Sequence, residues 1–175
     1  GAAGEFCSGA DLTGRSSNRH QLAAMRHVGD VALALHRLPQ PTIAKVRGVA
    51  VGAGCNLALG CDLVVAGETA RFSEIFAKRG LSLDFGTSWL LRQRIGAHKA
   101  KELAFTAKMF SGLEAFDLGL VNAVVPADDL DRAAREVVDT IAAGPPIALS
   151  ITKREINNAA TMSLAQALEV EALAQ

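Results

Sequence analysis

The residues best suited to chemistry stand in the stretch VGAGCNLALGCD, residues 51–62. Gly52, Ala53 and Gly54 follow a run that is rich in β-branched residues, and the amide Asn56 stands where a helical pattern begins. A glycine-rich turn between a strand and a helix presents free backbone N–H groups and the positive end of the helix dipole to a ligand. Such a turn suits a phosphate, or an oxygen that gains negative charge during a reaction.

Two known phosphate-binding motifs fit this turn poorly. No Gly-Lys-Ser/Thr follows it, so it is not a Walker loop, and Leu57 stands where the third glycine of a dinucleotide fingerprint belongs. Close packing of the helix on the strand would also select small residues. The stretch therefore favours an oxyanion-binding turn, with packing alone as the structural alternative and a dinucleotide-binding domain as a distant one.

A second group with chemical potential is Asp84. It stands between Leu83 and Phe85, and no basic residue is nearer in the chain than Arg79. Apolar surroundings raise the pKa of a carboxyl group towards neutral pH, where the group can act as a general base. The structural alternative is a turn or N-cap aspartate ahead of the helix that begins near TSWLL, although Thr87 or Ser88 could cap that helix without it.

Apolar periodicity predicts the elements that must position these groups. Helices are predicted over 21–38, 56–59, 88–96 and 98–107, from a capping box of Ser111 and Glu114, over 130–142, and as a C-terminal pair over 148–160 and 164–174. Strands are predicted over 42–51, 63–66, 70–73 and 121–125. Their alternation indicates an α/β fold class with largely parallel strands.

Composition excludes several classes of protein. The 175 residues suffice for one core, and 18 basic residues balance 18 acidic ones, which argues against a nucleic-acid-binding protein. No apolar run is long enough for a membrane span, and no signal peptide opens the chain. An odd number of cysteines favours a reducing compartment, and hence the cytoplasm. Cys55 and Cys61 have no histidine at ligand spacing, so no metal site is expected.

Three segments together resemble the enoyl-CoA hydratase/isomerase family, or crotonase superfamily: FCSGADL (6–12), PTIAKVRGVAVGAGCNLALGCDLVVAG (41–67) and FAKRGLSLDFGTSWLLRQRIG (76–96). The resemblance extends from Gly4 to about Ala160. It implies a crotonase-like β-β-α spiral core over 1–145 and the start of a C-terminal helical region over 146–175, with both ends apparently truncated. It also implies an acyl-CoA thioester as substrate, coenzyme A as part of that substrate with no separate cofactor, and assembly as a homotrimer or hexamer.

The resemblance also assigns catalytic roles by motif position. Two backbone N–H groups hold the thioester carbonyl in this family, and they fall on Ala10 and Ala53. The two glutamates of the hydratases fall on Asn56 and Phe76, and neither side chain is an acid or base. Several isomerase branches place a catalytic aspartate at the position of Asp84. The combination is similar to the branch that isomerises ring-opened or unsaturated acyl-CoA in phenylacetate breakdown.

The resemblance implies further residues that contact the substrate, and two alternative functions stay open beside the isomerase. Ser8, Asp11 and Leu12 stand in the loop that contacts the adenine of coenzyme A in this family. Gly52 and Gly54 are expected to lie against the acyl chain, Phe76 and Trp89 to line the acyl pocket, and Asn56 to contact the substrate as well. Asp11 could instead bond its own turn, and the aromatic residues could be plain core. One alternative function is a hydratase or other lyase that activates water with Glu74, if the motif slips by two residues, or with an unseen residue. Another is a non-catalytic acyl-CoA-binding subunit.

Overall fold

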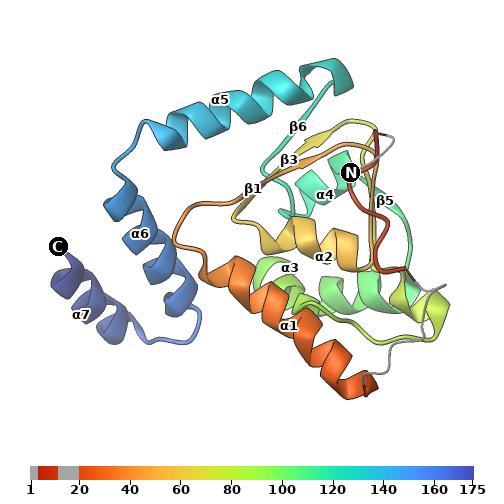
Figure 1. The fold of residues 1–175 in the computed structure, drawn as a ribbon, viewed down its shortest axis with the longest axis horizontal. Helices are drawn as coiled ribbons and strands as arrows, with labels where there is room; N and C mark the ends of the chain where they lie inside the picture. The colour runs from red at the N-terminus through yellow and green to blue at the C-terminus, as the bar shows by residue number, and fades with distance from the viewer. Residues whose placement is uncertain (1–3, 12–19) are drawn as a thin grey trace.

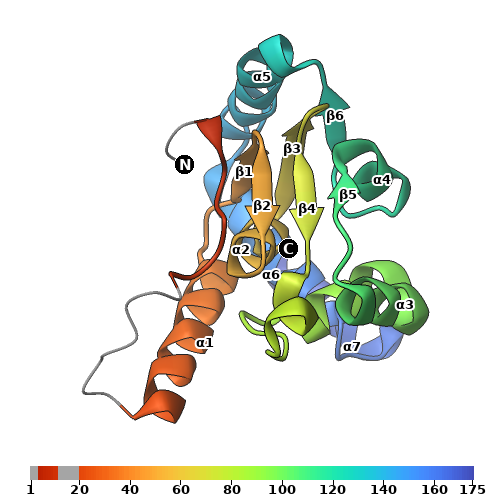
Figure 2. The same ribbon diagram turned by 90° about the vertical axis from the view of Figure 1, so that its right-hand side faces the viewer.

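A computed structural model describes residues 4–11 and 20–175 (Figures 1 and 2). Within these residues the strands form two three-stranded sheets. The first sheet has the order β1-β3-β6 and is parallel throughout, with strands β1 (Ile43–Val46), β3 (Leu63–Gly67) and β6 (Ala123–Val125). In the second, β2 (Val49–Val51) pairs parallel with β4 (Arg71–Ser73), and β4 pairs antiparallel with β5 (Phe110–Ser111). The largely parallel α/β architecture is confirmed.

The prediction of a single strand over 42–51 is wrong. The chain changes sheets at Gly48, because β1 pairs with β3 whereas β2 pairs with β4. Gly48 has φ +62°, a left-handed conformation that favours glycine and ends an extended strand. Its carbonyl then accepts a hydrogen bond from the Arg71 N–H at 2.9 Å, which holds the start of the second sheet. After this change of sheet, β2 leads directly into the glycine-rich turn.

The predicted helices are present, with shifts at their ends. Among the described residues, the α-helices are α1 (Gln21–Arg37), α2 (Ala53–Gly60), α3 (Thr87–Thr106), α4 (Gly112–Asp117), α5 (Leu130–Ala142), α6 (Pro146–Ala159) and α7 (Leu164–Ala174). The 3₁₀ turns η2 (Ile75–Arg79) and η3 (Ala127–Asp129) connect some of the elements. α2 begins at Ala53 and not at Asn56, so the small residues form its first turn. Gly96, with φ 72° and ψ 166°, interrupts α3 between the two predicted helices, and the capping box of Ser111 and Glu114 is confirmed.

The core lies between the sheets and α2. Val64, Val65 and Ala66 are all buried, and this lack of alternation shows that β3 is covered on both faces. Phe72 stacks on Phe110 with ring centroids 5.7 Å apart. In both ribbon views α2 lies beside the strands, with α1 and α3 on its other sides, and it contacts all of them. α2 is therefore fixed by packing, and so is the turn that begins it.

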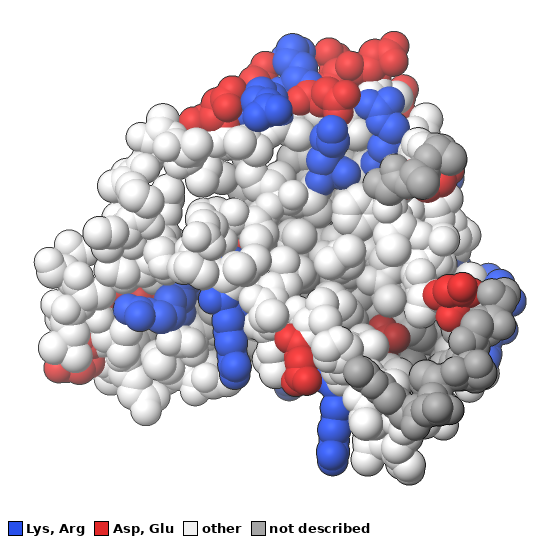
Figure 3. Space-filling model, in the orientation of Figure 1, with Lys and Arg blue, Asp and Glu red and all other residues white. Residues whose placement is uncertain are grey.

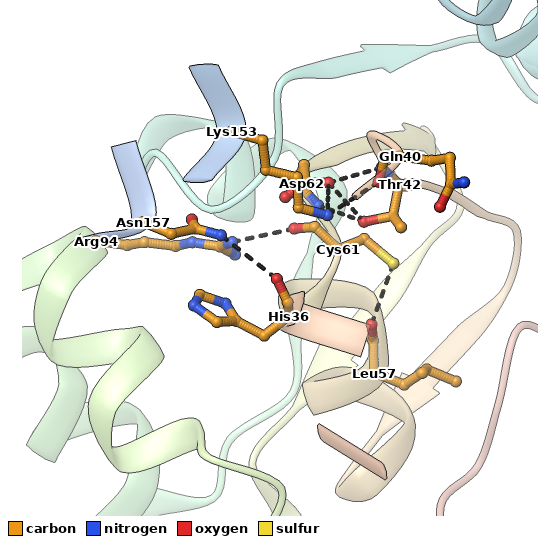
Figure 4. A network of polar contacts seen from close by, with 9 residues as sticks. All are labelled: His36, Gln40, Thr42, Leu57, Cys61, Asp62, Arg94, Lys153 and Asn157. Carbon is orange, nitrogen blue, oxygen red and sulfur yellow. Dashed lines mark hydrogen bonds and ion pairs between the residues drawn. The ribbon is translucent and has the colours of Figure 1, made fainter. Parts of the chain in front are cut away.

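The helix α6 (Pro146–Ala159) attaches to this core through polar contacts (Figure 4). The Lys153 ammonium on α6 lies 2.7 Å from the Asp62 carboxylate, and only 8% of the Lys153 side chain is exposed. Asp62 also accepts hydrogen bonds from the N–H and hydroxyl of Thr42, at 2.6 and 2.8 Å. α6 begins at Pro146, where the predicted boundary between core and helical region falls, and that division stays a prediction.

Surface features add little that points to a function. Figure 3 shows that the largest cluster of charged side chains on one face lies over α5, where Lys45 pairs with Asp131 and Arg132 with Glu136. The part of the chain that the structure describes contains no helix long and apolar enough to cross a bilayer. Within the same residues, no group of three or more His, Cys, Asp or Glu side chains is arranged to hold a metal ion. The three cysteines are free thiols.

Candidate active site

A cleft of about 990 Å³ opens beside the N-terminal end of α2. Among its lining residues are most of those predicted from the sequence: Ser8, Ala10, Asp11, Gly52, Ala53, Phe76 and Asp84. Leu12 lies outside the described residues. The cleft thus brings together three segments that are distant in the chain, and these are the segments that carry the family resemblance.

Backbone hydrogen bonds place Ala10 beside Ala53. The Cys7 N–H donates to the Val49 carbonyl at 2.9 Å, and the Val51 N–H donates to the Cys7 carbonyl at 3.0 Å, so this segment runs parallel to β2. Gly9 crosses the end of β2, where an added Cβ would lie 3.6 Å from the nitrogen of Ala53. Among the described residues, neither the Ala10 N–H nor the Ala53 N–H has a hydrogen-bond partner. Two free donors therefore line the cleft, as an oxyanion site requires.

The two glycines around Ala53 serve different purposes. Gly52 is the N-cap of α2 with φ 56°, and its N–H donates to the Ser73 carbonyl at 2.9 Å. Gly54 faces away from the cleft, because an added Cβ would lie 2.1 Å from the Cys7 carbonyl oxygen. Glycine at 54 is thus required for the packing of the segment that carries Ala10 and not for contact with an acyl chain. Gly54 thus agrees with the structural alternative, in which small residues serve close packing, whereas Gly52 lines the cleft.

Asp84 is held at the cleft by a buried amide. The Asn56 side-chain nitrogen donates to the Asp84 carboxylate and to its carbonyl oxygen, both at 3.2 Å. The carboxyl group is half-buried, and this burial raises its pKa, while the hydrogen bond from Asn56 opposes the rise. Gly86 is the N-cap of α3, and no side chain caps that helix. The carboxylate of Asp84 therefore does not act as an N-cap, and it remains available to a ligand.

Asn56 and Phe76 occupy the positions of the hydratase glutamates, and they behave differently. Asn56 is fully buried, and its side-chain nitrogen donates to the Asp84 carboxylate. It therefore holds the proposed base in position and does not itself line the cleft. Phe76 is 6% exposed and lines the cleft with an apolar ring. Neither can activate water. Both fit a site whose single well-supported base is Asp84.

Trp89 is not brought to this cleft. It lies on α3 beside a separate cavity of about 440 Å³, where its ring meets the ring of His36 edge-on at 5.7 Å. The wall of the main cleft is formed by α1 instead, through Leu22, Met25 and Val28. The sequence indicated an apolar face on this helix, yet none of its residues, all of which the structure describes, is buried. The face was not predicted to line the site.

Glu74 is a further titratable residue near the site, and the sequence pattern did not predict where its side chain lies. It follows β4 and is 1% exposed, and neither carboxyl oxygen has a hydrogen-bond partner among the described residues. Its pKa is raised to about 7, chiefly by burial and also by the charge of Asp84, whereas the thiol of Cys55 lowers it. Glu74 does not line the cleft, unlike Ile75 and Phe76, which follow it.

Comparison with known proteins agrees with this geometry. The family model Enoyl-CoA hydratase/isomerase matches residues 1–175. The chain is 34% identical to 1,2-epoxyphenylacetyl-CoA isomerase of Escherichia coli (strain K12), over 98% of this chain and 68% of that protein. It is 36% identical to the short-chain-enoyl-CoA hydratase of Clostridium acetobutylicum, over 78% of this chain and 52% of that protein. The chain thus spans between about half and two thirds of these curated relatives.

A solved structure shows the same fold with CoA bound. A Thermobifida fusca YX protein assigned to the enoyl-CoA hydratases, solved in complex with CoA, superposes with a TM-score of 0.90 at 32% identity. The superposition covers 98% of this chain and 71% of that one. The expected crotonase-like fold with C-terminal helices is therefore confirmed, and the relatives with this fold are enzymes. By its sequence and its fold, the chain belongs to the enoyl-CoA hydratase/isomerase family.

Proposed function

We propose that this chain carries the active site of an acyl-CoA enzyme that shifts a double bond in an enoyl-CoA thioester. The observation that carries the proposal is the shared cleft, in which the Asp84 carboxyl group faces the same space as the unpartnered N–H groups of Ala10 and Ala53. Fixed donors in a partly enclosed cleft stabilise negative charge that develops on a carbonyl oxygen, and the loss of one such donor costs about 3 to 4 kcal/mol.

The reaction needs one carboxylate. Asp84 takes a proton from C2 of a 3-enoyl thioester, and the electron pair moves to the thioester oxygen, which the N–H groups of Ala10 and Ala53 hold as a dienolate. Asp84 then gives the proton to C4, and the double bond comes to lie between C2 and C3. No proton or electron is gained overall, so the step requires no water and no further reactant.

Hydration is the alternative that the relatives keep open, since one of them is named a hydratase. The two-glutamate route would need acidic side chains at positions 56 and 76, which hold Asn56 and Phe76. Glu74 was the proposed substitute, and its carboxyl group lies outside the cleft lining. These positions favour isomerisation over hydration and over simple acyl-CoA binding.

The test is the product formed from 3-enoyl-CoA and 2-enoyl-CoA thioesters. We expect a shifted double bond, and we expect Asp84→Asn to lower kcat by about 10²- to 10⁴-fold, the range for the loss of a general base. Asp117→Asn, at an exposed position on α4, is the matched control. A 3-hydroxyacyl product would establish the hydratase, binding without turnover would establish a non-catalytic subunit, and full activity of Asp84→Asn would remove Asp84 from the mechanism.

Substrate and assembly are proposed on the same grounds. The CoA in the Thermobifida fusca relative supports an acyl-CoA ligand. We expect Ser8 and Asp11, which line the cleft, to lie near the adenine of that ligand. Assembly as a homotrimer or hexamer fits the apolar side chains exposed on α6 and α7, among them Ile156, Leu164 and Leu173. Light scattering of the purified protein checks the oligomer, and a monomer at micromolar concentration would contradict it.

A further inference from the structure

Glu74 is buried at the back of the active site without an evident structural purpose. It connects β4 to η2, and the next two residues, Ile75 and Phe76, turn towards the cleft. Its own side chain turns inward and is 1% exposed. A carboxyl group in this position costs folding free energy if it is charged and unpaired. The residue therefore calls for a role that offsets this cost.

The carboxyl oxygens of Glu74 are buried and have no hydrogen-bond partner among the described residues. Buried side-chain atoms without a hydrogen-bond partner, among the described residues, are the two carboxyl oxygens of Glu74 and the Oδ1 of Asn56. Asn56 directly follows Cys55, the residue whose thiol interacts with Glu74. A carboxyl group that is buried without a partner costs less free energy in its neutral form than in its charged form. The surroundings therefore favour the neutral acid.

The charged neighbours act in the same direction. The titratable groups that act on Glu74 are Cys55 in the first turn of α2 and Asp84 on the loop before α3, and no Lys, Arg or His among the described residues does. Burial and the charge of Asp84 both raise the pKa of Glu74, which reaches about 7. Because coupling between two carboxyl groups is mutual, ionised Glu74 would also disfavour the charged form of Asp84.

We propose that Glu74 is a positioning residue of the active site, which keeps its proton throughout the reaction and so leaves Asp84 without a second negative charge beside it. The inference rests on the proposed function, because it needs a reaction that builds negative charge on the thioester oxygen. No bond to Glu74 forms or breaks in the reaction. Its proton stays in place, and no co-reactant is required.

The position of Cys55 explains why the charged form of Glu74 would be harmful. Cys55 belongs to the same first helical turn as Ala53, whose N–H lines the cleft. The positive end of the α2 dipole therefore lies near both Glu74 and the proposed oxyanion. A negative charge on Glu74 would repel the negative charge that builds up on the thioester oxygen. The neutral acid leaves the whole effect to the enolate.

The first test is the pH profile of kcat/KM for the unmodified chain and for Glu74→Gln. For the unmodified chain we expect activity to fall as pH rises through 7, by about 30-fold at a pH 1.5 units above the pKa of Glu74, as follows for a group that must stay protonated. Glu74→Gln, which keeps the shape and cannot ionise, should show no alkaline fall over this range. Glu68→Gln, at an exposed turn, is the matched control and should keep the alkaline fall.

The second test requires no turnover. The ¹³C signal of the Asp84 carboxyl group is followed by NMR as a function of pH, and ionisation of Glu74 should appear as a second inflection near pH 7. The same titration in Glu74→Gln should show a single inflection. This readout would not respond to a role of Glu74 in packing alone.

The outcomes separate this inference from the proposed function. An alkaline fall that survives in Glu74→Gln would overturn the role of Glu74, and so would a single Asp84 inflection in the unmodified chain. If neither thioester is turned over but the coupled inflection is present and is lost in Glu74→Gln, the proposed reaction fails while the pairing of Glu74 with Asp84 stands.

Discussion

At the scale of single residues, the site depends on what Asn56 does in place of an acid. Its amide donates to the Asp84 carboxylate and to the carbonyl of the same residue, so it fixes both the position and the charge of the base. Burial raises the pKa of Asp84, and this hydrogen bond limits the rise. One carboxylate then serves both proton transfers, because the group that accepts the proton is the group that returns it.

Removal of the Ala53 N–H tests the oxyanion site alone. Ala53 is the first residue of α2, a position where proline is well tolerated because its missing N–H has no partner within the helix. We expect Ala53→Pro to lower kcat by about 10²- to 10³-fold, the effect of losing one oxyanion donor. Ala53→Gly, which keeps the N–H, is the control in the same steady-state assay. Equal kcat values for the two variants would show that this N–H does not act on the substrate.

The chemical groups were predicted better than their surroundings. The family resemblance implied Ala10 and Ala53, the resemblance and the apolar neighbours in the chain together indicated Asp84, and the structure brings the three to one cleft. Trp89 was expected in the acyl pocket but lies at another cavity, because an apolar residue near a helix start can face either side of that helix. The burial of Glu74 was not predicted, since no pattern tells which way a residue turns just after a short strand.

At the scale of elements, the segment that carries Ala10 depends on the missing side chain of Gly54. We expect Gly54→Ala to lower the free energy of unfolding by about 1 to 3 kcal/mol, because its Cβ would meet the Cys7 carbonyl at 2.1 Å and the backbone would have to shift. Catalytic activity should fall as Ala10 moves. Urea denaturation and the isomerase assay check both effects.

The control for this variant lies on α1. Gly29→Ala adds a Cβ that meets nothing within 4 Å, in the middle of a helix. It should raise the free energy of unfolding by about 0.5 to 1 kcal/mol, the usual gain from glycine to alanine in a helix. If Gly54→Ala were as stable and active as the Gly29→Ala control, the close packing around Cys7 would not position the site.

The attachment of α6 depends on Lys153 (Figure 4). Replacement by alanine leaves the partly buried Asp62 carboxylate without its cation, and we expect the free energy of unfolding to fall by about 2 kcal/mol. Lys101→Ala, at an exposed position of α3, should change it little. The measurement is urea denaturation of both variants. An unchanged midpoint for Lys153→Ala would mean that the apolar contacts of α6 suffice.

Most elements could be predicted from periodicity, and the exceptions have physical reasons. Strand propensity indicated extended chain in the run 42–51, but it could not tell that the run is divided into two strands of different sheets, and only Gly48 marks the change. The apolar face of α1 was recognised, yet periodicity does not distinguish a face that packs on a core from one that lines a cleft. Local patterns fix the elements, whereas pairing depends on contacts between distant segments.

At the scale of the whole molecule, Glu74 links stability to pH. Its pKa is about 7 in the folded chain against an ordinary value of 4.5. A raised acid pKa leaves folding unaffected below pH 4.5, and stability is then lost as pH rises to 7. The difference of 2.5 units, 7 minus 4.5, corresponds to a loss of about 3 kcal/mol.

Glu74→Gln should remove this loss. Its free energy of unfolding should match that of the unmodified chain at the acid end and exceed it by about 3 kcal/mol above neutral pH. Urea denaturation at a series of pH values gives the difference, with Glu68→Gln as the exposed control. A difference that does not change with pH would show that Glu74 has the same pKa in the folded and the unfolded chain.

The central claim concerns the place of the substrate in the folded molecule. The direct measurement is a crystal structure of the protein with an unreactive acyl-CoA thioester. We expect the thioester oxygen at about 3 Å from the nitrogens of both Ala10 and Ala53, with the Asp84 carboxylate beside C2 and C4 of the acyl group. A thioester bound elsewhere, or an oxygen that meets neither N–H group, would contradict the account.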